Sequence, residues 1–519
     1  MTDSILRSGV PALLDAFTGA PPERQVAEFL RLTEAVWHDG TVTDAAAAAV
    51  ADLRAALDQA PAEQQGYLLV LLGLLVEAEY PETGGVIYTA VRDGMERYLD
   101  LARGLTGDEP LTFAALYLLG HFPADRDRIL AAVKGIRLAP DDRTRLDRCL
   151  QELNYDDPDI GRSWPSPWDW GITEQEREYD RKWIAALSRE QITRTWEWDT
   201  RSVWAYMGAK AYWAVQHGMP TDAVEDVSPE EVTAGSAQEL PPSAYSQHLD
   251  ALRCPQCGGR FEAAANRLSC QNCGAEYSVS RGVLDLSQRT RPGTSLSETP
   301  EDVKKDVLQA AAAISGIGFH YENGMRPSFL RVMGMNWNGA VAPADEDAYL
   351  ATHSGSPAGT LLDVGAGAGR WTSVLAEAVG PEHVLALDLS EAVLLDLRTR
   401  LPQVPAVRAS AVELPFADAS LDGINCWNAL QALPDAEQAL REIGRCLRPG
   451  GLLTMMTFVW APDPVYRHFQ HSHHFPARPD GFPLFELADV RAWLDRAGLA
   501  VRHEDTSGTF FFVTAERRA

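Results

Sequence analysis

Four of the chain's seven cysteines lie within 20 residues of one another: Cys254, Cys257, Cys270 and Cys273. They form two Cys-x-x-Cys pairs, and each pair is followed by a glycine, Gly258 or Gly274, that permits a tight turn. Two such pairs can supply the four thiolates of a tetrahedral Zn²⁺ site, which leaves no position open for water. The spacing therefore predicts a structural zinc, and the clustering in a long chain argues against a disulfide framework.

A glycine-rich turn lies in the last third of the chain. Thr360–Arg370 reads TLLDVGAGAGR, a buried-strand pattern that leads into D-x-G-x-G-x-G, and a helix is expected from Trp371 to about Val379. Glycines here let the backbone turn sharply and approach a cofactor closely. A second expected strand, HVLALDLS, contains Asp388, whose carboxylate could accept both hydroxyls of an adenosine ribose. NAD-binding folds use the same device, so these residues alone leave two cofactors open.

Two further motifs follow in order, AVELPFADASLDGINCWNALQAL at 411–433 and ALREIGRCLRPGGLLTMMTF at 439–458. Together with the glycine pattern they resemble the class I methyltransferases that depend on S-adenosylmethionine (SAM). They are most similar to the small-molecule group that includes the ubiquinone and menaquinone C-methyltransferases. The resemblance covers about residues 310–519 and implies a C-terminal α/β Rossmann-like domain that binds SAM.

The same resemblance assigns expected contacts with the cofactor. Asp363 would support the methionine amino end, Asp388 would hold the ribose diol, and Leu389 would flank the adenine. Relatives often place an Asp near position 410 to accept the adenine amino group. This chain has Ser410, so we expect adenine recognition that is weaker, backbone-mediated or assigned to another residue. The full set of expected cofactor-binding residues is Tyr321, Arg326, Asp363, Gly365, Ala366, Gly367, Gly369, Asp388, Leu389, Ser410, Ala411, Val412, Asn425, Cys426 and Trp427.

Tyr321 and Arg326 belong to FHYENGMRPSF, a segment that comes before the first strand of the expected domain. Relatives often close the cofactor site with such a helix, and these two side chains are candidates for the sulfonium side or the carboxylate of the cofactor. A packing helix that carries a surface Arg is the alternative interpretation.

Histidines gather after the expected fifth strand, in VYRHFQHSHHFPARPDGFPLF. Four of the chain's 12 histidines lie within seven residues there: His468, His471, His473 and His474. This family builds its substrate pocket in that region, and imidazole suits general-base work because it titrates near neutral pH. We expect a catalytic base among His468, His471, His474 and the upstream His320. A solvated cluster and an adventitious metal site are the alternatives.

The residues after the second cysteine pair resemble one kind of zinc ribbon. Glu276-Tyr277, the basic turn Arg281-Gly282 and the apolar end Val283–Leu286 are similar to a small module that partners tRNA, rRNA and protein methyltransferases. Bacteria often fuse this module to methyltransferase domains. The usual Pro-Ile after the Tyr is replaced by Ser278-Val279. The resemblance implies a small β zinc ribbon and leaves the substrate open.

Residues 1–218 are expected to be all-α. Ala46–Ala60, Gln64–Glu79 and Leu111–Val133 show helical apolar spacing. Ala114–Val133 resembles a HEAT-type repeat unit, which implies a solenoid with a concave face, and an irregular helical bundle is the alternative. Eight of the 14 tryptophans lie in residues 164–213, where we favour packing over ligand recognition.

Composition divides the chain into five parts. Residues 219–247 and 288–300 have linker composition and separate a helical domain at 1–218, a zinc ribbon at 248–287 and a methyltransferase domain at 301–519. The formal net charge is −27, of which −20 falls on 1–250, +2 on 251–300 and −9 on 301–519. This charge argues against nucleic acid, because neutralising phosphates requires clustered Lys and Arg.

No apolar run reaches the roughly 18 residues of a membrane span, and the N-terminus lacks the features of a signal peptide, so we expect a cytoplasmic protein without a membrane partner. The expected function is SAM-dependent methyl transfer to a small-molecule or peptide acceptor in natural-product metabolism. The helical region would recognise a substrate, a carrier or a protein partner. An RNA base methyltransferase, a non-catalytic SAM-binding scaffold, and cyclisation or aminocarboxypropyl transfer on the same fold remain alternatives.

Overall fold

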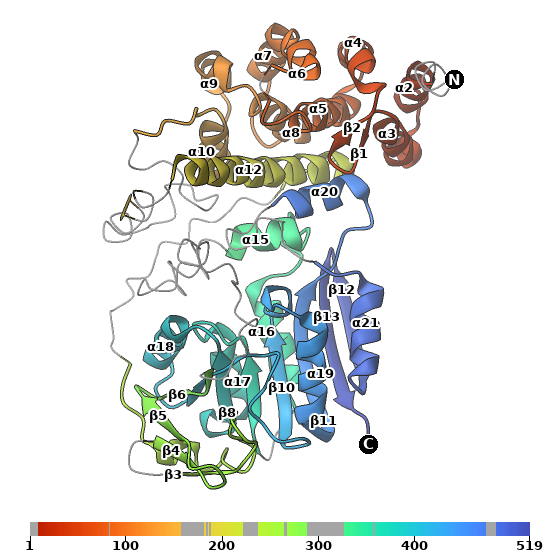
Figure 1. Cartoon of the computed structure of the whole chain (residues 1–519). Helices are drawn as coiled ribbons and strands as arrows, with labels where there is room; N and C mark the ends of the chain where they lie inside the picture. Colours follow the sequence, from red (N-terminus) through yellow and green to blue (C-terminus); the bar gives the residue numbers. More distant parts are fainter. Residues whose placement is uncertain are drawn as a thin grey trace. The chain divides into compact units, whose positions relative to one another are not determined.

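The computed structural model describes residues 9–82, 84–156, 181–182, 185, 188–221, 237–263, 267–287, 326–355, 359–473 and 484–519 (Figure 1). The chain forms two compact units. The first holds Met1–Asp226 and Ala461–Phe482, and the second holds Val227–Trp460 and Pro483–Ala519. After Trp460 the chain therefore leaves the second unit, contributes a short segment to the first, and returns.

The first unit is helical, as the sequence predicts. Its described elements are α2 (Val10–Thr18), α3 (Pro22–Val36), the strand pair β1 (Trp37–His38) and β2 (Thr41–Val42), α4 (Ala46–Leu57), α5 (Ala62–Glu77), α6 (Val86–Arg92), α7 (Met95–Arg103), α8 (Pro110–Leu119), the short η1 (Pro123–Asp125), α9 (Arg126–Val133), α10 (Pro140–Cys149), α12 (Arg189–His217) and α20 (Pro464–Ser472). The three helical segments expected from apolar spacing are confirmed, and the chain turns between α8 and α9 where the sequence carries Pro123.

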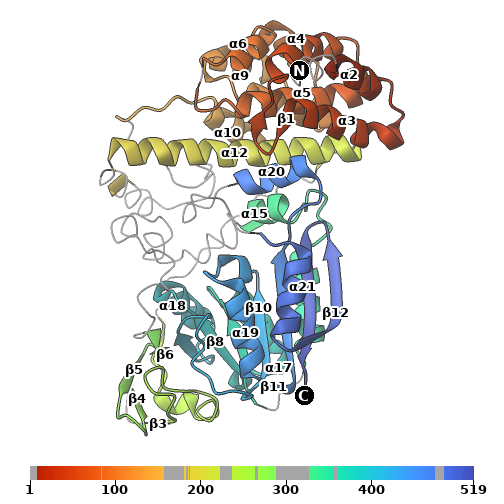
Figure 2. The same ribbon diagram turned by 45° about the vertical axis from the view of Figure 1, so that its right-hand side comes forward.

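Two helices form the centre of this unit because they are apolar on every side. The residues of α5 from Gly66 to Glu77 and those of α8 from Thr112 to Leu119 are all buried. A helix with no polar face must be surrounded by other elements. The long α12 packs against both α5 and α8, and α20 lies along α12 (Figure 2).

The ends of α12 follow from its sequence. Ser188 and Gln191 form a reciprocal capping box at the start, and Gly218, in the left-handed conformation at φ 61°, ends the helix. Trp204 and Trp213 of this helix are buried, which agrees with the prediction that they pack in the core. Trp164, Trp168, Trp170 and Trp183 lie outside the described residues.

The second unit is built on a sheet of 11 described strands in the order β12-β13-β11-β10-β7-β8-β9-β6-β5-β4-β3. Their bounds are β3 (Phe261–Ala263), β4 (Arg267–Cys270), β5 (Glu276–Ser280), β6 (Val283–Asp285), β7 (Leu361–Val364), β8 (Val384–Asp388), β9 (Ala406–Arg408), β10 (Leu421–Trp427), β11 (Leu447–Phe458), β12 (Leu499–Ser507) and β13 (Phe510–Arg517).

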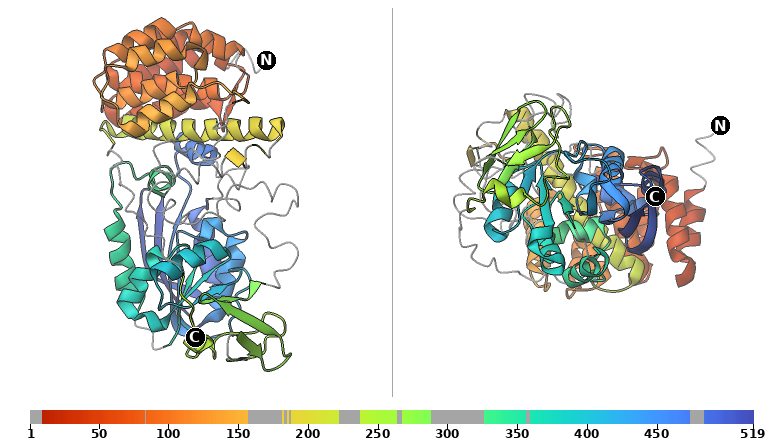
Figure 3. Two further views of the ribbon diagram at one scale, coloured as in Figure 1. Left: turned by 90° about the vertical axis from the view of Figure 1, so that its left-hand side faces the viewer. Right: turned by 90° about the horizontal axis from the view of Figure 1, so that it is seen from below.

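The described helices of this unit are α15 (Arg326–Met333), α16 (Pro343–His353), α17 (Arg370–Val379), α18 (Glu391–Arg400), α19 (Ala436–Cys446) and α21 (Leu487–Arg496). Helices cover both faces of the sheet. Figures 1 and 3 show α19 and α21 together on one face and α16 and α17 on the other. The predicted α/β Rossmann-like fold is confirmed for this unit.

The order of the parallel strands predicts where a binding crevice lies. From β7 the chain moves outward to β8 and β9 on one side, and then crosses back to β10 and β11 on the other. In open parallel sheets, ligands bind outside the carboxyl ends of the strands where this reversal occurs. Here that point lies between β7 and β10.

The predicted domain boundaries differ from the structure at two places. Residues 461–482, expected in the methyltransferase domain, belong to the first unit, because the apolar side chains Val465 and Phe469 of α20 are buried there. Part of the expected linker 219–247 is folded, because the buried Tyr245 donates its hydroxyl to the carbonyls of Gly282 and Ala406 at 3.0 and 2.7 Å.

The four-cysteine segment is not a separate body. Its strand β6 pairs in parallel with β9, so the small antiparallel hairpins β3 to β6 continue the central sheet.

No helix in the described residues is long and apolar enough to cross a membrane.

Candidate functional site

Asp363 and Asn425 meet at the carboxyl ends of β7 and β10, where the strand order reverses. Asn425 donates its amide Nδ2 to Asp363 Oδ1 at 2.7 Å, and Thr372 donates its hydroxyl to Asp363 Oδ2 at 2.6 Å. All three side chains are buried. The parallel register of the two strands places Asn425 beside Asp363. Two predicted cofactor residues are therefore in direct contact, and Thr372 fixes the carboxylate from α17.

Burial changes the acidity of this cluster. It raises the pKa of Asp363 to about 6, with the hydrogen bonds from Thr372 and Asn425 partly opposing the rise. Burial also raises the pKa of the Cys426 thiol to about 12, and the nearby Asp363 adds to the effect. Cys426 is therefore a neutral thiol at neutral pH and is no nucleophile there.

The glycine-rich turn after β7 adopts the conformation that its glycines predict. Gly365, Gly367 and Gly369 have φ values of 70°, 54° and 89°, which side chains rarely adopt. The backbone N–H groups of Gly365 and Ala366 both donate to the Leu387 carbonyl, at 2.8 and 3.0 Å. This ties the turn to the neighbouring strand β8 and sets its height above the sheet.

The three glycines have different surroundings. A Cβ at Gly365 would lie 2.5 Å from the Cβ of Ala429, and a Cβ at Gly369 would lie 2.9 Å from Leu397 Cγ. A Cβ at Gly367 would meet no atom within 4 Å in the described residues. Gly365 and Gly369 thus allow close packing, whereas Gly367 borders open space.

Asp388 ends β8 and is oriented by the backbone. Its Oδ2 accepts the N–H of Gly367 at 3.1 Å, and its Oδ1 accepts the N–H of Ser390 at 2.9 Å. Each carboxylate oxygen keeps a further lone pair for another donor. The carboxylate is therefore fixed beside the glycine turn and can accept two adjacent hydroxyls.

The predicted adenine segment follows β9. Ser410, Ala411 and Val412 are buried, and the Ser410 hydroxyl accepts the N–H of Val412 at 3.4 Å. The Leu389 carbonyl accepts from the Arg408 guanidinium at 3.1 Å. None of these contacts tests which group would recognise an adenine amino group, and that expectation stays a prediction.

Arg326 lies at the start of α15 and is buried. Its guanidinium donates to both oxygens of the buried Glu346, at 2.7 and 2.6 Å, and stacks over the Trp371 ring at 4.5 Å. Trp427 donates its indole N–H to the same carboxylate at 2.8 Å. Arg326 is therefore paired with an acid from α16 and is not a surface Arg. A contact of its guanidinium with the cofactor stays a prediction.

Asn425 Oδ1 and Arg326 Nε are among the buried polar atoms of the described residues that lack a hydrogen-bond partner. Buried polar atoms rarely stay unpaired, and each could pair with a ligand, Asn425 Oδ1 with an ammonium and Arg326 Nε with a carboxylate. These atoms, the open side of Gly367 and the carboxylate of Asp388 fit the amino-acid and ribose parts of SAM.

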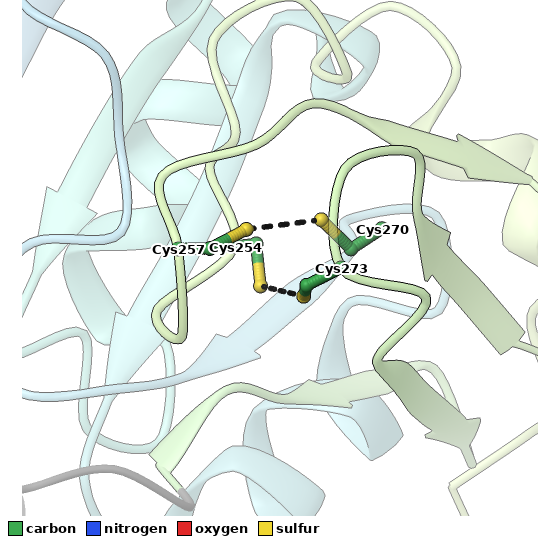
Figure 4. A group of neighbouring side chains, drawn as sticks. All are labelled: Cys254, Cys257, Cys270 and Cys273. Carbon is green, nitrogen blue, oxygen red and sulfur yellow. Dashed lines mark hydrogen bonds between the residues drawn. The ribbon is translucent and has the colours of Figure 1, made fainter.

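The four cysteines converge in the second unit (Figure 4). Their sulfurs all lie within 4.8 Å of one another, with 3.8 Å between Cys254 and Cys273 and 3.4 Å between Cys257 and Cys270. A tetrahedron with Zn–S bonds of about 2.3 Å places its sulfurs about 3.8 Å apart. Gly258 and Gly274 both have a φ of 71°, as their place after each pair predicts. The four thiols can therefore hold one metal ion.

A cavity of about 520 Å³ separates the first cysteine pair from the methyltransferase segment. Arg253 and Leu286 line one side, and Ser410, Phe416 and Arg445 line the other. Asp363, Asp388 and Asn425 do not line it, so it is not the crevice at the strand ends.

The predicted catalytic histidines are placed only in part. His468 lies on α20 in the first unit, where its Nε2 is 3.2 Å from Glu77 Oε1. His471 lies on the same helix and is exposed. His474, His320 and the predicted cofactor residue Tyr321 lie outside the described residues.

Sequence reasoning missed Thr372 and Glu346. Thr372 lies in the helix after the glycine turn, and nothing in the sequence separates it from a packing residue. Glu346 is part of PADEDAYL, in which three successive acidic residues look like a solvated surface. Only the fold shows that Glu346 is buried while Asp345 is exposed.

Comparisons with known proteins find methyltransferases. Residues 362–455 match the family model described as a methyltransferase domain. An uncharacterized chloroplastic methyltransferase of Arabidopsis thaliana is 28% identical over 234 residues, which are 40% of this chain and 62% of that protein. A demethylmenaquinone methyltransferase of Listeria welshimeri is 40% identical over 99 residues, which are 18% of this chain and 42% of that protein. The chain thus spans less than two thirds of the length of either relative.

Solved structures resemble part of the chain. One comes from a complex of the Haloferax volcanii Trm112 methyltransferase activator with a methyltransferase, and it is 17% identical with a TM-score of 0.31. That likeness covers 39% of this chain and 98% of the other. A geranyl diphosphate C-methyltransferase from Streptomyces coelicolor is 16% identical with a TM-score of 0.28, over 34% of this chain and 76% of the other.

Proposed function

We propose, from the class I methyltransferase domain that residues 362–455 represent, that the protein transfers a methyl group from SAM to a small-molecule or peptide acceptor in natural-product metabolism. The observation that carries the proposal is the contact of Asp363, Thr372 and Asn425 at the strand reversal, next to the carboxylate of Asp388. Binding of SAM in this arrangement uses one buried acid for the ammonium group and a second acid for the ribose diol.

Each cofactor-facing residue then has one role. Asp363, held by Thr372 and Asn425, accepts the methionine ammonium group. Asp388 accepts the two ribose hydroxyls, and the open side of Gly367 lets the backbone lie close to the cofactor. Asn425 Oδ1 and Arg326 Nε complete the pairing of the amino-acid end. When bound, SAM supplies an electrophilic methyl group on a sulfonium sulfur.

The protein's part in the transfer is positioning, since an in-line displacement gains most of its rate from the placement of the acceptor. Cys426 stays protonated and takes no covalent part. An acceptor of low acidity needs a base, and His468, His471, His474 and His320 remain the proposed candidates for that role.

The four cysteines are proposed to bind one structural zinc. Four thiolate ligands leave no open coordination position, so the ion would supply no catalytic water. Its proposed role is to hold the hairpins β3 to β6 against β9.

The proposal is tested by transfer of a labelled methyl group. Purified protein, checked for zinc content, is incubated with SAM carrying a tritiated methyl group and a panel of phenols, naphthohydroquinones and short peptides. Incorporation into one acceptor class that disappears in Asp388→Ala supports the proposal. Incorporation that is equal in Asp388→Ala, or SAM that does not bind the wild-type protein at millimolar concentration, would overturn it.

A further inference from the structure

The segment that follows β11 is folded into the helical unit. It includes α20, which begins six residues after the last residue of β11, and the chain then returns to the second unit at Pro483. The sequence predicts a substrate pocket in this segment. The contacts that hold α20 could therefore link the helical unit to methyl transfer. Most of that unit lies more than 200 residues earlier in the chain.

One end of α20 is held by hydrogen bonds to α12. Asp463, which caps α20, accepts the Tyr212 hydroxyl at 2.8 Å and the Gln216 amide at 3.0 Å. Further along α20, Phe469 lies against Gly208 of α12, where an added Cβ would come within 2.2 Å of the Phe469 ring. Packing and capping thus fix the position of the helix.

The other contact is electrostatic and centres on Glu77, at the end of α5. Its side chain is 2% exposed. Oε1 lies 3.2 Å from His468 Nε2, whereas Oε2 accepts the Tyr117 hydroxyl at 2.7 Å and lies 3.7 Å from His121 Nε2. Groups from α5, α8 and α20 thus meet at one buried carboxylate.

The carboxylate is charged in this setting. Burial alone would raise the pKa of Glu77, but hydrogen bonds and charge from His121 and His468 outweigh burial and hold the pKa well below its usual range. A buried charge is costly unless it is paired, so Glu77 needs its partners in place. Tyr117 is on α8 and His121 follows the end of that helix, whereas His468 is the partner that belongs to α20.

The orientation of His468 is also fixed. The ring packs edge-to-face on Trp37 at 4.9 Å, and the side chain of His468 is 12% exposed. A carboxylate behind an imidazole sets the direction of the ring, as in other acid–histidine pairs. In this pair the acid comes from the helical unit and the histidine from the segment after β11.

We propose that Glu77 is a positioning residue for methyl transfer, which acts through His468 to hold α20 and thereby lets the helical unit control the segment that follows β11. This inference rests on the proposed methyltransferase function for its effect on turnover. The hold on α20 can be measured without any acceptor.

The test is hydrogen–deuterium exchange on the full-length, zinc-loaded protein. In Glu77→Gln and in His468→Gln, the backbone amides of 465–473 are expected to exchange at least about tenfold faster than in wild type. The double variant is expected to exchange no faster than either single one, because both remove the same contact. Glu77→Asp, which keeps the charge, should recover part of the protection.

Glu28→Gln is the matched control, because Glu28 is also a buried glutamate of the first unit but pairs with the surface residues Arg24 and Arg31. It should leave 465–473 unchanged. Additive effects of Glu77→Gln and His468→Gln, or unchanged exchange in both, would overturn the proposal. If Glu77→Gln does not fold, His468→Gln still tests the proposal, because His468 is the more exposed of the two partners.

Calorimetry with S-adenosylhomocysteine separates this proposal from the proposed function. The dissociation constant is expected to change less than twofold in Glu77→Gln and His468→Gln, while kcat for whichever acceptor of the panel is methylated falls relative to Glu28→Gln. Failure of the wild-type protein to bind S-adenosylhomocysteine would overturn the proposed function. The exchange of 465–473 would still decide whether Glu77 holds α20.

Discussion

At the scale of single residues, the glycine turn separates two uses of glycine. Gly365 and Gly367 share a left-handed backbone, but only Gly365 has a neighbour within contact distance of an added Cβ. The positive φ costs a non-glycine residue about 1–2 kcal/mol in both positions. Any loss of folding free energy beyond this cost then depends on the surroundings of each glycine.

The prediction concerns the variants Gly365→Ala and Gly367→Ala. We expect Gly365→Ala to lower the free energy of unfolding more than Gly367→Ala, because its methyl group would overlap Ala429. Gly367→Ala should mainly weaken S-adenosylhomocysteine binding, since its methyl group would enter the open side of the turn. Urea unfolding and calorimetry measure the two effects, and equal losses in both variants would contradict this assignment.

Asp363 gives a prediction about pH. Its pKa of about 6 means that the carboxylate gains a proton as the pH falls below 6. An ammonium group binds the charged form, so we expect the affinity for S-adenosylhomocysteine to fall by up to about tenfold per pH unit below 6. Calorimetry between pH 5 and 8 tests this. The variant Asp363→Asn should bind weakly with no such dependence.

Protonation of Asp363 would not lower the affinity by unfolding the protein. Because the folded pKa of Asp363 is raised above its unfolded value, the folded state takes up the proton first, and this group favours folding as the pH falls from 6 towards 4. Affinity that stays constant from pH 5 to 8 would show that the charge of Asp363 is not used in binding.

At the scale of elements, the cysteine hairpins support the segment after β9. Leu286 donates its N–H to the Arg408 carbonyl, Arg253 donates to Pro415, and Ala417 donates to Ala251. Leu252 forms a bridge with Phe416. The hairpins thus hold both ends of the predicted adenine segment, which lies between Arg408 and Pro415.

We therefore predict that loss of the metal affects more than the hairpins. Chelation, or the variant Cys273→Ser, should release about one zinc per chain, lower the melting temperature by several degrees and weaken S-adenosylhomocysteine binding. Cys149→Ala, which removes a cysteine of the first unit, is the control. Thiols that titrate freely in untreated protein without any bound zinc would contradict the metal assignment.

The elements of the site could largely be foreseen from sequence. The glycine pattern predicts β7, the turn and α17, and HVLALDLS predicts β8 with Asp388 at its end, because buried strands and glycine turns have strong local signals. Glu346 could not be foreseen, since its partners Arg326 and Trp427 lie 20 and 81 residues away. A local acidic pattern contains no information on such contacts.

At the scale of the whole molecule, the sequence predicts a helical domain and a methyltransferase domain with a zinc ribbon between them, and the structure has two compact units. The ribbon was expected to be separate, but its strand β6 extends the central sheet. Residues 461–473, which the sequence places in the catalytic domain, belong to the helical unit. In both cases the decisive contacts join segments far apart in the chain, such as Glu77 with His468, which no local pattern predicts. The HEAT-like solenoid stays a prediction.

We propose that SAM binds at the carboxyl ends of β7, β8 and β10. Isothermal calorimetry of the full-length protein with S-adenosylhomocysteine at pH 7.5 tests it most directly. We expect saturable binding of one molecule per chain, with an affinity at least about tenfold lower in Asp388→Ala, which removes the acceptor of the ribose hydroxyls. The absence of binding at millimolar concentration, or an affinity unchanged in Asp388→Ala, would contradict it.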